Sequence, residues 1–288
     1  MKMNSIIKGL IILLLAFCLA GACAIVPNKT EDRCSMEENK DPDTGEEITL
    51  TAVAEYTSNS GGPKPLPDSP YSYEMWTQGG NNNKLIWYGP EQGGGAAFRT
   101  EWNNPSIYLG RVGLLWGNGG EYTEYKNIFV DFKFTRSGRN TAGSHSYIGI
   151  YGWSRNPAAE KSEEKLIEYY VVDDWYGNQW QSDETPLGIN TTGGKVIGTF
   201  FVDGSDYQVI TNIRVNQPSI EGTKTFIQYF SVRQEPRQCG TISVTEHFKK
   251  WEEMGLALGS MYEAKFLVEA GSGTGWFDAS YLAFRQED

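Results

Sequence analysis

The chain has 288 residues, of which 39% are hydrophobic, enough to bury the core of one or two domains. Its formal net charge of -11 argues against nucleic acid as a partner, because a phosphate backbone is bound by clustered Lys and Arg. The two His and four Cys show no metal-ligand spacing, so we expect no metal and no cofactor. The 33 Gly and the 13% aromatic content favour a turn-rich β protein.

Residues 1–22 are predicted to be a secretory signal peptide. Lys2 and Lys8 accompany an apolar run over 10–19, and small residues follow at 20–22. The run is too short to span a membrane. Two outcomes stay open: release of a secreted, extracellular protein, or a bacterial lipoprotein. In the second case a lipid on Cys23, which follows Leu-Ala-Gly-Ala, would hold the protein at the cell surface and be its only membrane contact.

Residues 23–70 are predicted to form an acidic, flexible tether. Acidic sequence that contains Pro and Gly and has few large apolar residues cannot offset its ordering entropy. Thr49 to Tyr56 alternates weakly and is a candidate edge strand. Secretion permits a disulfide between Cys34 in this segment and Cys239, but the sequence does not establish one.

From residue 71 to 288 strand patterns follow one another, separated by turn residues, and predict one β domain. The expected strands are Lys84–Tyr88, Ala97–Trp102, Ser106–Leu109, Asn127–Thr135, Tyr147–Trp153, Leu166–Asp174, Lys195–Val202, Ser205–Val215, Thr223–Arg233 and Tyr262–Glu269. One helix is expected over Thr245–Leu258, where apolar residues repeat at helical spacing. Many strands and a single α-helix predict an all-β, two-sheet sandwich.

Two carboxylates interrupt otherwise apolar strands. Alternation along Leu166–Asp174 puts two sets of side chains on opposite faces: Glu168, Tyr170 and Val172 on a possible cleft face, and Ile167, Tyr169 and Val171 on a core face. Glu269 closes a second apolar strand. Each could be an exposed strand acid. Together, ringed by Trp and Tyr, they suggest glycoside hydrolysis, which needs one group to protonate the leaving oxygen and another to attack the anomeric carbon.

Four runs, in order over roughly residues 71 to 285, resemble glycoside hydrolase family 11, the β-jelly-roll endo-1,4-β-xylanases. These runs are Tyr151–Pro157, Leu166–Asp173, Arg214–Phe226 and Gln228–Gln234. The resemblance implies a catalytic jelly roll over 71–288 that cleaves internal β-1,4-xylosidic bonds of xylan. It also implies retention by double displacement, with Glu168 as nucleophile and Glu269 as general acid/base, in a monomer whose partner is xylan.

The resemblance further implies eight substrate-binding residues: Trp76, Tyr151, Tyr170, Arg214, Pro218, Ser219, Ile220 and Gln228. Pro218 to Ile220 match the tip of the family's mobile thumb loop. For Trp76, Tyr151 and Tyr170 the alternative interpretation is core packing.

Three departures from the family pattern limit what carries over. Ile107 stands where the family has an Asn or Asp that tunes the acid/base, so the family's pH optimum does not transfer. Ala270–Gly271 replaces the usual Gly-Tyr, and residues 158–165 are a charged insertion that we expect to be a solvated hairpin extension. Two other functions remain open: a non-catalytic carbohydrate-binding jelly roll and a retaining β-glucanase.

Overall fold

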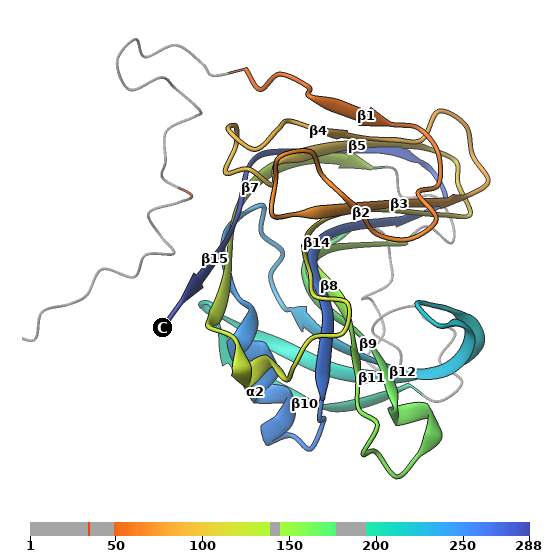
Figure 1. Cartoon of the computed structure of the whole chain (residues 1–288), viewed down its shortest axis with the longest axis vertical. Coiled ribbons are helices and arrows are strands. Elements are labelled where there is room, and N and C mark those ends of the chain that lie inside the picture. The colour runs from red at the N-terminus through yellow and green to blue at the C-terminus, as the bar shows by residue number, and fades with distance from the viewer. Residues whose placement is uncertain (1–33, 35–48, 139–144, 177–193) are drawn as a thin grey trace, which may run out of the picture.

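The computed structural model describes residue 34 and residues 49–138, 145–176 and 194–288. Two β-sheets make up most of this part of the chain (Figure 1). The six-stranded sheet has the order β1 (Ala54–Tyr56), β4 (Lys84–Trp87), β5 (Phe98–Asn103), β15 (Thr274–Glu287), β7 (Asn127–Gly138) and β13 (Cys239–Ser243). This arrangement confirms the predicted two-sheet all-β sandwich.

The nine-stranded sheet carries the candidate site. Its order is β10 (Lys195–Val202), β11 (Ser205–Ser219), β12 (Gly222–Arg233), β9 (Leu166–Asp174), β8 (His145–Arg155), β14 (Ser260–Gly271), β6 (Ile107–Leu115), β3 (Ser72–Gln78) and β2 (Lys64–Pro65). β9 and β12 run parallel, with Glu168 opposite Gln228, whereas β9 and β8 are antiparallel. The β11–β12 hairpin curls back at the right of Figure 1.

Alternating side chains explain how the two sheets pack. In β7, Ile128, Val130, Phe132 and Phe134 are all buried in the main core, as their spacing predicts. Phe132 and Phe134 meet Phe266 of the other sheet, with ring centroids 5.6 and 6.0 Å apart. The aromatic contacts between β7 and β14 therefore hold the sheets face to face.

The α-helix that lies wholly within the described residues is α2 (Val244–Glu253), and two short 3-10 turns, η1 (Tyr122–Glu124) and η2 (Ser162–Glu164), complete the elements. Our prediction extended this helix to Leu258, which was wrong. The chain leaves the helix through Met254 and then Gly255, whose φ of 83° is in the left-handed region that Gly tolerates. Trp251 of α2 packs against Tyr169, and its indole N–H donates to Ser231 Oγ at 2.8 Å.

Residues 49–70 differ from the tether that we predicted, because they pair with both sheets. β1 is the edge strand of the smaller sheet, which confirms the predicted edge strand over Thr49 to Tyr56 only for its last three residues. β2 pairs with β3, Leu66 is 3% exposed, and the ring of Tyr56 stacks on Tyr73 with centroids 3.7 Å apart. These contacts offset the entropy cost of ordering residues 49–70. Composition alone had predicted that this cost would leave the segment flexible. The predicted signal peptide and Cys23 lie outside the described residues.

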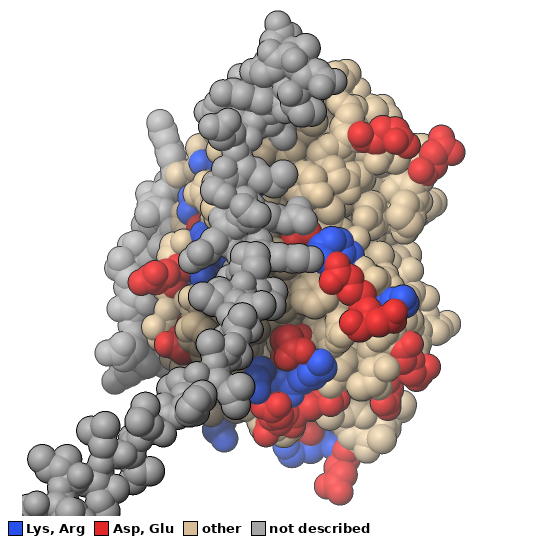
Figure 2. All heavy atoms as spheres, turned by 90° about the vertical axis from the view of Figure 1, so that its left-hand side faces the viewer, with Lys and Arg blue, Asp and Glu red and all other residues tan. Residues whose placement is uncertain are grey.

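Charges of both signs are interleaved on the surface face that Figure 2 shows, where Lys and Arg lie among Asp and Glu. The described ranges contain no helix that is long and apolar enough to cross a membrane.

A disulfide joins Cys34 to Cys239 at the start of β13, with their Cα atoms 5.4 Å apart. The bond closes a loop over a sequence separation of 205 residues. Closing so long a loop restricts the unfolded chain strongly, so the bond should stabilise the folded state by about 2–4 kcal/mol.

Replacing Cys34 and Cys239 together by Ser should therefore lower the thermal unfolding midpoint, which calorimetry measures. Reductant should lower the midpoint of the native protein and leave that of the double variant unchanged. Equal midpoints for the oxidised protein and the double variant would contradict a stabilising role.

Candidate active site

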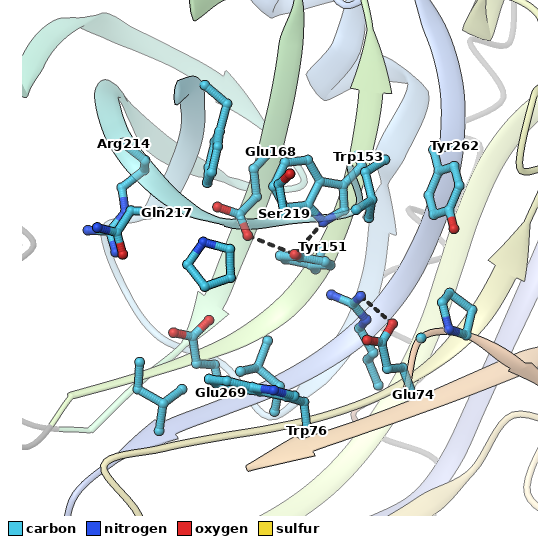
Figure 3. A pocket seen from close by; sticks show the side chains of 18 of the residues that line it. Glu74, Trp76, Tyr151, Trp153, Glu168, Arg214, Gln217, Ser219, Tyr262 and Glu269 are labelled. Carbon is cyan, nitrogen blue, oxygen red and sulfur yellow. Dashed lines mark hydrogen bonds and ion pairs between the residues drawn. The ribbon is translucent and has the colours of Figure 1, made fainter. Parts of the chain in front are cut away.

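A cleft of about 640 Å³ lies on the face of the nine-stranded sheet that points away from the six-stranded sheet. Its walls come from strands that are far apart in sequence, and Glu168 and Glu269 both line it (Figure 3). All eight predicted substrate-binding residues line it too: Trp76, Tyr151, Tyr170, Arg214, Pro218, Ser219, Ile220 and Gln228. The structure thus brings together every site residue that we predicted from the sequence.

Strand β9 presents its two faces as alternation predicts. Ile167, Tyr169 and Val171 belong to the core between the sheets, whereas Tyr170 packs in a separate apolar cluster on the cleft side. Glu168 shares the cleft face with Tyr170 and is only 8% exposed. Glu168 is therefore a buried carboxylate in a cleft, not an exposed strand acid.

Both oxygens of the Glu168 carboxylate accept hydrogen bonds. The Tyr151 hydroxyl donates to Oε1 at 2.7 Å, and Gln228 Nε2 donates to Oε2 at 2.6 Å. Each donor is itself held: Trp153 Nε1 donates to the Tyr151 hydroxyl at 2.5 Å, and Asn212 Nδ2 donates to Gln228 Oε1 at 2.9 Å. These bonds fix the orientation of the carboxylate and favour its charged form.

Glu269 enters the cleft from β14, opposite Glu168 in Figure 3. The Tyr170 hydroxyl donates to Glu269 Oε2 over a long 3.4 Å, and it also lowers the pKa of Glu168, so it acts on both carboxylates. His145 Nε2 lies 3.9 Å from Glu269 Oε1. Because Glu269 accepts fewer and longer hydrogen bonds than Glu168, its negative charge is less well stabilised.

The pKa values reflect this asymmetry. Burial, and next the negative charge of Glu168, raise the pKa of Glu269 to about 8. Burial also raises the pKa of Glu168, but hydrogen bonds from Tyr151, Gln228 and Tyr170 and the charge of Arg214 oppose the rise. Near neutral pH the cleft is therefore arranged to hold a protonated Glu269 beside a Glu168 whose charge is hydrogen-bonded.

The β11–β12 hairpin forms one wall of the cleft, with Pro218, Ser219 and Ile220 at its tip. Ser219 Oγ donates to the carbonyl oxygen of Gly222 at 2.6 Å and closes the turn. Arg155 on β8 pairs with Glu221 of the tip at 2.7 Å, which ties the hairpin to the body of the sheet. Arg214, on the same hairpin, lines the cleft and acts on both carboxylates through its charge.

The aromatic side chains in the cleft are not simple core residues. Trp76 is partly exposed and lines the cleft from β3, opposite Leu109 of β6. Tyr151 and Tyr170 are buried, but each uses its hydroxyl on a carboxylate. Ile107 also lines the cleft, so an apolar side chain occupies that part of the wall.

Sequence reasoning missed a buried group of charges beneath Tyr151. The Arg111 guanidinium lies 4.3 Å from the centre of the Tyr151 ring and pairs with Glu74 at 2.5 Å and Glu263 at 3.2 Å. Lys265 pairs with Glu263 at 2.6 Å. Two cations therefore balance two carboxylates, as burial of charge requires. The single Arg in the otherwise apolar strand 107–115 could have indicated this group of charges. The carboxylates that it pairs with could not be predicted, because they depend on strand register.

The charged insertion at 158–165 is the connection between β8 and β9. The Asn156 N–H, just before the insertion, donates to the carbonyl oxygen of Lys165 at its end at 3.0 Å, and the insertion contains η2. None of its residues lines the cleft. It forms the predicted solvated hairpin extension and leaves Glu168 directed toward Glu269.

In the part of the chain that the structure describes, no three His, Cys, Asp or Glu residues cluster as a metal site would need.

The sequence model of glycosyl hydrolases family 11 matches residues 68–280. This chain belongs to that family. The endo-1,4-beta-xylanase C of Fibrobacter succinogenes is 44% identical over 214 residues, which cover 74% of this chain and 31% of that protein. The endo-1,4-beta-xylanase A of Bacillus pumilus is 34% identical over 228 residues, covering 79% of this chain and 87% of that protein.

Solved structures of xylanases share the family 11 fold. The crystal structure of wild-type ENZbleach xylanase has a TM-score of 0.78 and 59% sequence identity, over 88% of this chain and 94% of that one. The chain spans less than two thirds of some curated relatives: 57% of the endo-1,4-beta-xylanase S20 of Neocallimastix patriciarum and 31% of the Fibrobacter protein. Those relatives thus contain further sequence outside the family 11 region.

Replacing Glu168 by Gln should lower the pKa of Glu269 below its value of about 8, because a neutral amide removes the negative charge that helps to raise it. A carbon-13 NMR titration of the Glu269 carboxyl measures this. Glu160→Gln, in the exposed insertion, should leave the pKa unchanged. An unchanged or higher pKa in the Glu168 variant would contradict the proposed coupling.

Proposed function

We propose that this protein is a retaining endo-1,4-β-xylanase that hydrolyses internal β-1,4-xylosidic bonds of xylan by double displacement. The observation that carries the proposal is the pair of unlike carboxylates in one aromatic cleft: Glu168 with hydrogen bonds to both oxygens, and Glu269 with a pKa of about 8. Membership of family 11 and the names of its relatives support xylan as the substrate.

In the first step Glu168 acts as the nucleophile. One of its oxygens forms a bond to the anomeric carbon, the glycosidic C–O bond breaks, and the proton of Glu269 passes to the leaving oxygen. Tyr151 and Gln228 hold the attacking carboxylate in place. The products of this step are a free sugar hydroxyl, an ionised Glu269 and an ester between the sugar and Glu168.

In the second step Glu269 acts as a base. Once Glu168 is an ester its negative charge is gone, so the pKa of Glu269 falls and the ionised form persists. Glu269 takes a proton from water, the water oxygen bonds to the anomeric carbon, and the ester bond breaks to return Glu168 as a carboxylate. Two inversions at one carbon give net retention of configuration.

The rest of the cleft would bind and orient the chain of sugars. The flat ring of Trp76 offers an apolar surface for one sugar face, and the hairpin tip at Pro218 to Ile220 covers the opposite side of the cleft. Arg214 and Gln228 line the wall next to the nucleophile. This division assigns binding to aromatic and hairpin residues and chemistry to the two carboxylates.

We further propose export of the protein as a monomer. The Cys34–Cys239 disulfide supports an oxidising compartment outside the cytosol, where such bonds persist. The leader at 1–22 would direct this export, either to the medium or to the cell surface through Cys23.

The Glu168→Ala variant should lose measurable release of reducing sugar from xylan, since no nucleophile remains. Added azide should restore turnover of an activated aryl xylobioside and yield a glycosyl azide, because a small anion can occupy the space that the carboxylate vacates. Mass spectrometry detects the azide product. The matched variant Glu160→Ala, in the exposed insertion, should retain the native rate.

Near-native xylan cleavage by Glu168→Ala would overturn the nucleophile assignment. Xylan binding in calorimetry without any sugar release by the native protein would instead favour a non-catalytic carbohydrate-binding domain. Faster release from β-glucan than from xylan would favour a retaining β-glucanase, because the cleft would then have to accommodate the hydroxymethyl group of glucose.

A further inference from the structure

Two fully buried charges on β14 have no part in the two reaction steps. Glu263 and Lys265 are both 0% exposed, and neither lines the cleft. Lys265 Nζ lies 2.6 Å from Glu263 Oε2. Burying an acid and a base costs free energy that their attraction does not always offset, and two apolar side chains of similar volume are often at least as stable. Stability alone therefore does not account for this pair.

Strand register puts the pair beside the side chains that hold Glu168. β14 pairs with β8, with Lys265 opposite Tyr151 and Glu263 opposite Trp153. Trp153 Nε1 donates to the Tyr151 hydroxyl, and this hydroxyl donates to Glu168 Oε1. The pair is therefore on the strand next to the two aromatic residues whose hydrogen bonds end at Glu168.

Arg111 of β6 connects the pair to Tyr151. Its Nη2 lies 3.2 Å from Glu263 Oε1 and 2.5 Å from Glu74 Oε2, and the guanidinium carbon lies 4.3 Å from the centre of the Tyr151 ring. Arg111 Nε is buried without a hydrogen-bond partner among the described residues. The guanidinium is thus placed against the ring by two carboxylates, at the expense of one unsatisfied donor.

A cation at the ring makes the Tyr151 hydroxyl a stronger donor. Burial, and next the negative charge of Glu168, raise the pKa of Tyr151, and the positive charge of Arg111 opposes this rise. A hydroxyl that is polarised by a cation makes a stronger hydrogen bond to a carboxylate.

The field at the ring also explains why Glu263 needs a cation of its own. The negative charge of Glu263 raises the pKa of Tyr151 and so acts against Arg111. Lys265 neutralises that charge at 2.6 Å. Glu263 can therefore hold the guanidinium without cancelling its effect on the hydroxyl.

We propose that the buried pair Glu263–Lys265 positions the nucleophile from outside the cleft. Glu263 holds Arg111 against the ring of Tyr151, and Lys265 balances the charge of Glu263. The cation at the ring strengthens the hydrogen bond from the Tyr151 hydroxyl to Glu168. The proposal rests on the function proposed above, in which Glu168 attacks the anomeric carbon. The pair and Arg111 are positioning residues, since they act through Tyr151.

The test removes both charges at once in the full chain, with Glu263→Met and Lys265→Met together as the pair variant. Arg111 still pairs with Glu74, so the remaining charges balance and the fold should survive. Glu74 alone then draws the guanidinium away from the ring. The kcat on xylan should fall about 5-fold, as the loss of one cation–π contact predicts. KM should stay within about 2-fold, because binding in the cleft is not the interaction removed.

The same change in a Tyr151→Phe background separates positioning from a structural role. Phe keeps the ring but lacks the hydroxyl, so removing the pair there should change kcat by less than about 2-fold. Carbon-13 NMR of the Glu168 carboxyl is independent of catalysis. The hydrogen bond from Tyr151 lowers the pKa of Glu168, so the pair variant should raise this pKa, and the same change in the Tyr151→Phe background should not.

Two further variants complete the test. Glu246→Met with Lys249→Met is the matched control, because this partly exposed pair on α2 has the same N–O distance of 2.6 Å and does not line the cleft. It should leave kcat and the pKa of Glu168 unchanged. Arg111→Lys keeps the charge balance and so remains informative if the pair variant does not fold. Lys lacks the flat fork that lies against a ring, so kcat should fall in the same direction.

An equal loss of kcat with and without the Tyr151 hydroxyl, or no loss in either background, would overturn the proposal. A raised KM with a native kcat would also overturn it, because the pair would then act on sugar binding. If the native protein releases no sugar from xylan, the xylanase function fails. The NMR titration still decides in that case whether the pair acts on Glu168, and an unchanged pKa in the pair variant would contradict it.

Discussion

The site depends on one electrostatic constraint: two carboxylates buried in one cleft cannot both ionise without a large desolvation and repulsion penalty. Glu168 accepts hydrogen bonds from Tyr151 and Gln228, whereas Glu269 accepts a long one from Tyr170. This difference separates the two groups and raises the pKa of Glu269 to about 8. It would also allow the proton to leave Glu269 once the charge on Glu168 is lost, which is what a double displacement needs.

The nine-stranded sheet maintains this asymmetry. The parallel pairing of β9 with β12 puts Gln228 beside Glu168, and the antiparallel pairing with β8 puts Tyr151 beside Tyr170. Behind Tyr151, Arg111 lies against the ring and is fixed by buried carboxylates. The two carboxylates are therefore held by rigid strands and by hydrogen bonds from their neighbours, as a preorganised site requires.

Local patterns predicted much of this: alternation in β9 put Glu168 on the cleft face, and the resemblance to family 11 assigned Glu269 and the eight binding residues that line the cleft. Features that depend on register were not predictable. β15 was missed because a bulge between Ala279 and Tyr281 breaks its alternation, and Tyr262 turns into the cleft through another bulge. Residues 61–63 line the cleft although composition predicted a tether there, because composition does not reveal the hydrogen bonds that hold the preceding Asn59 and Ser60 on β3.

The stereochemistry of hydrolysis tests the central claim most directly. Proton NMR can follow the anomeric signals of the sugars released from xylohexaose during the first minutes, before mutarotation equilibrates them. Attack by Glu168 followed by water predicts that the β-anomer forms first. Initial formation of the α-anomer would contradict the account, because it would mean a single displacement by water in which neither carboxylate acts as a nucleophile.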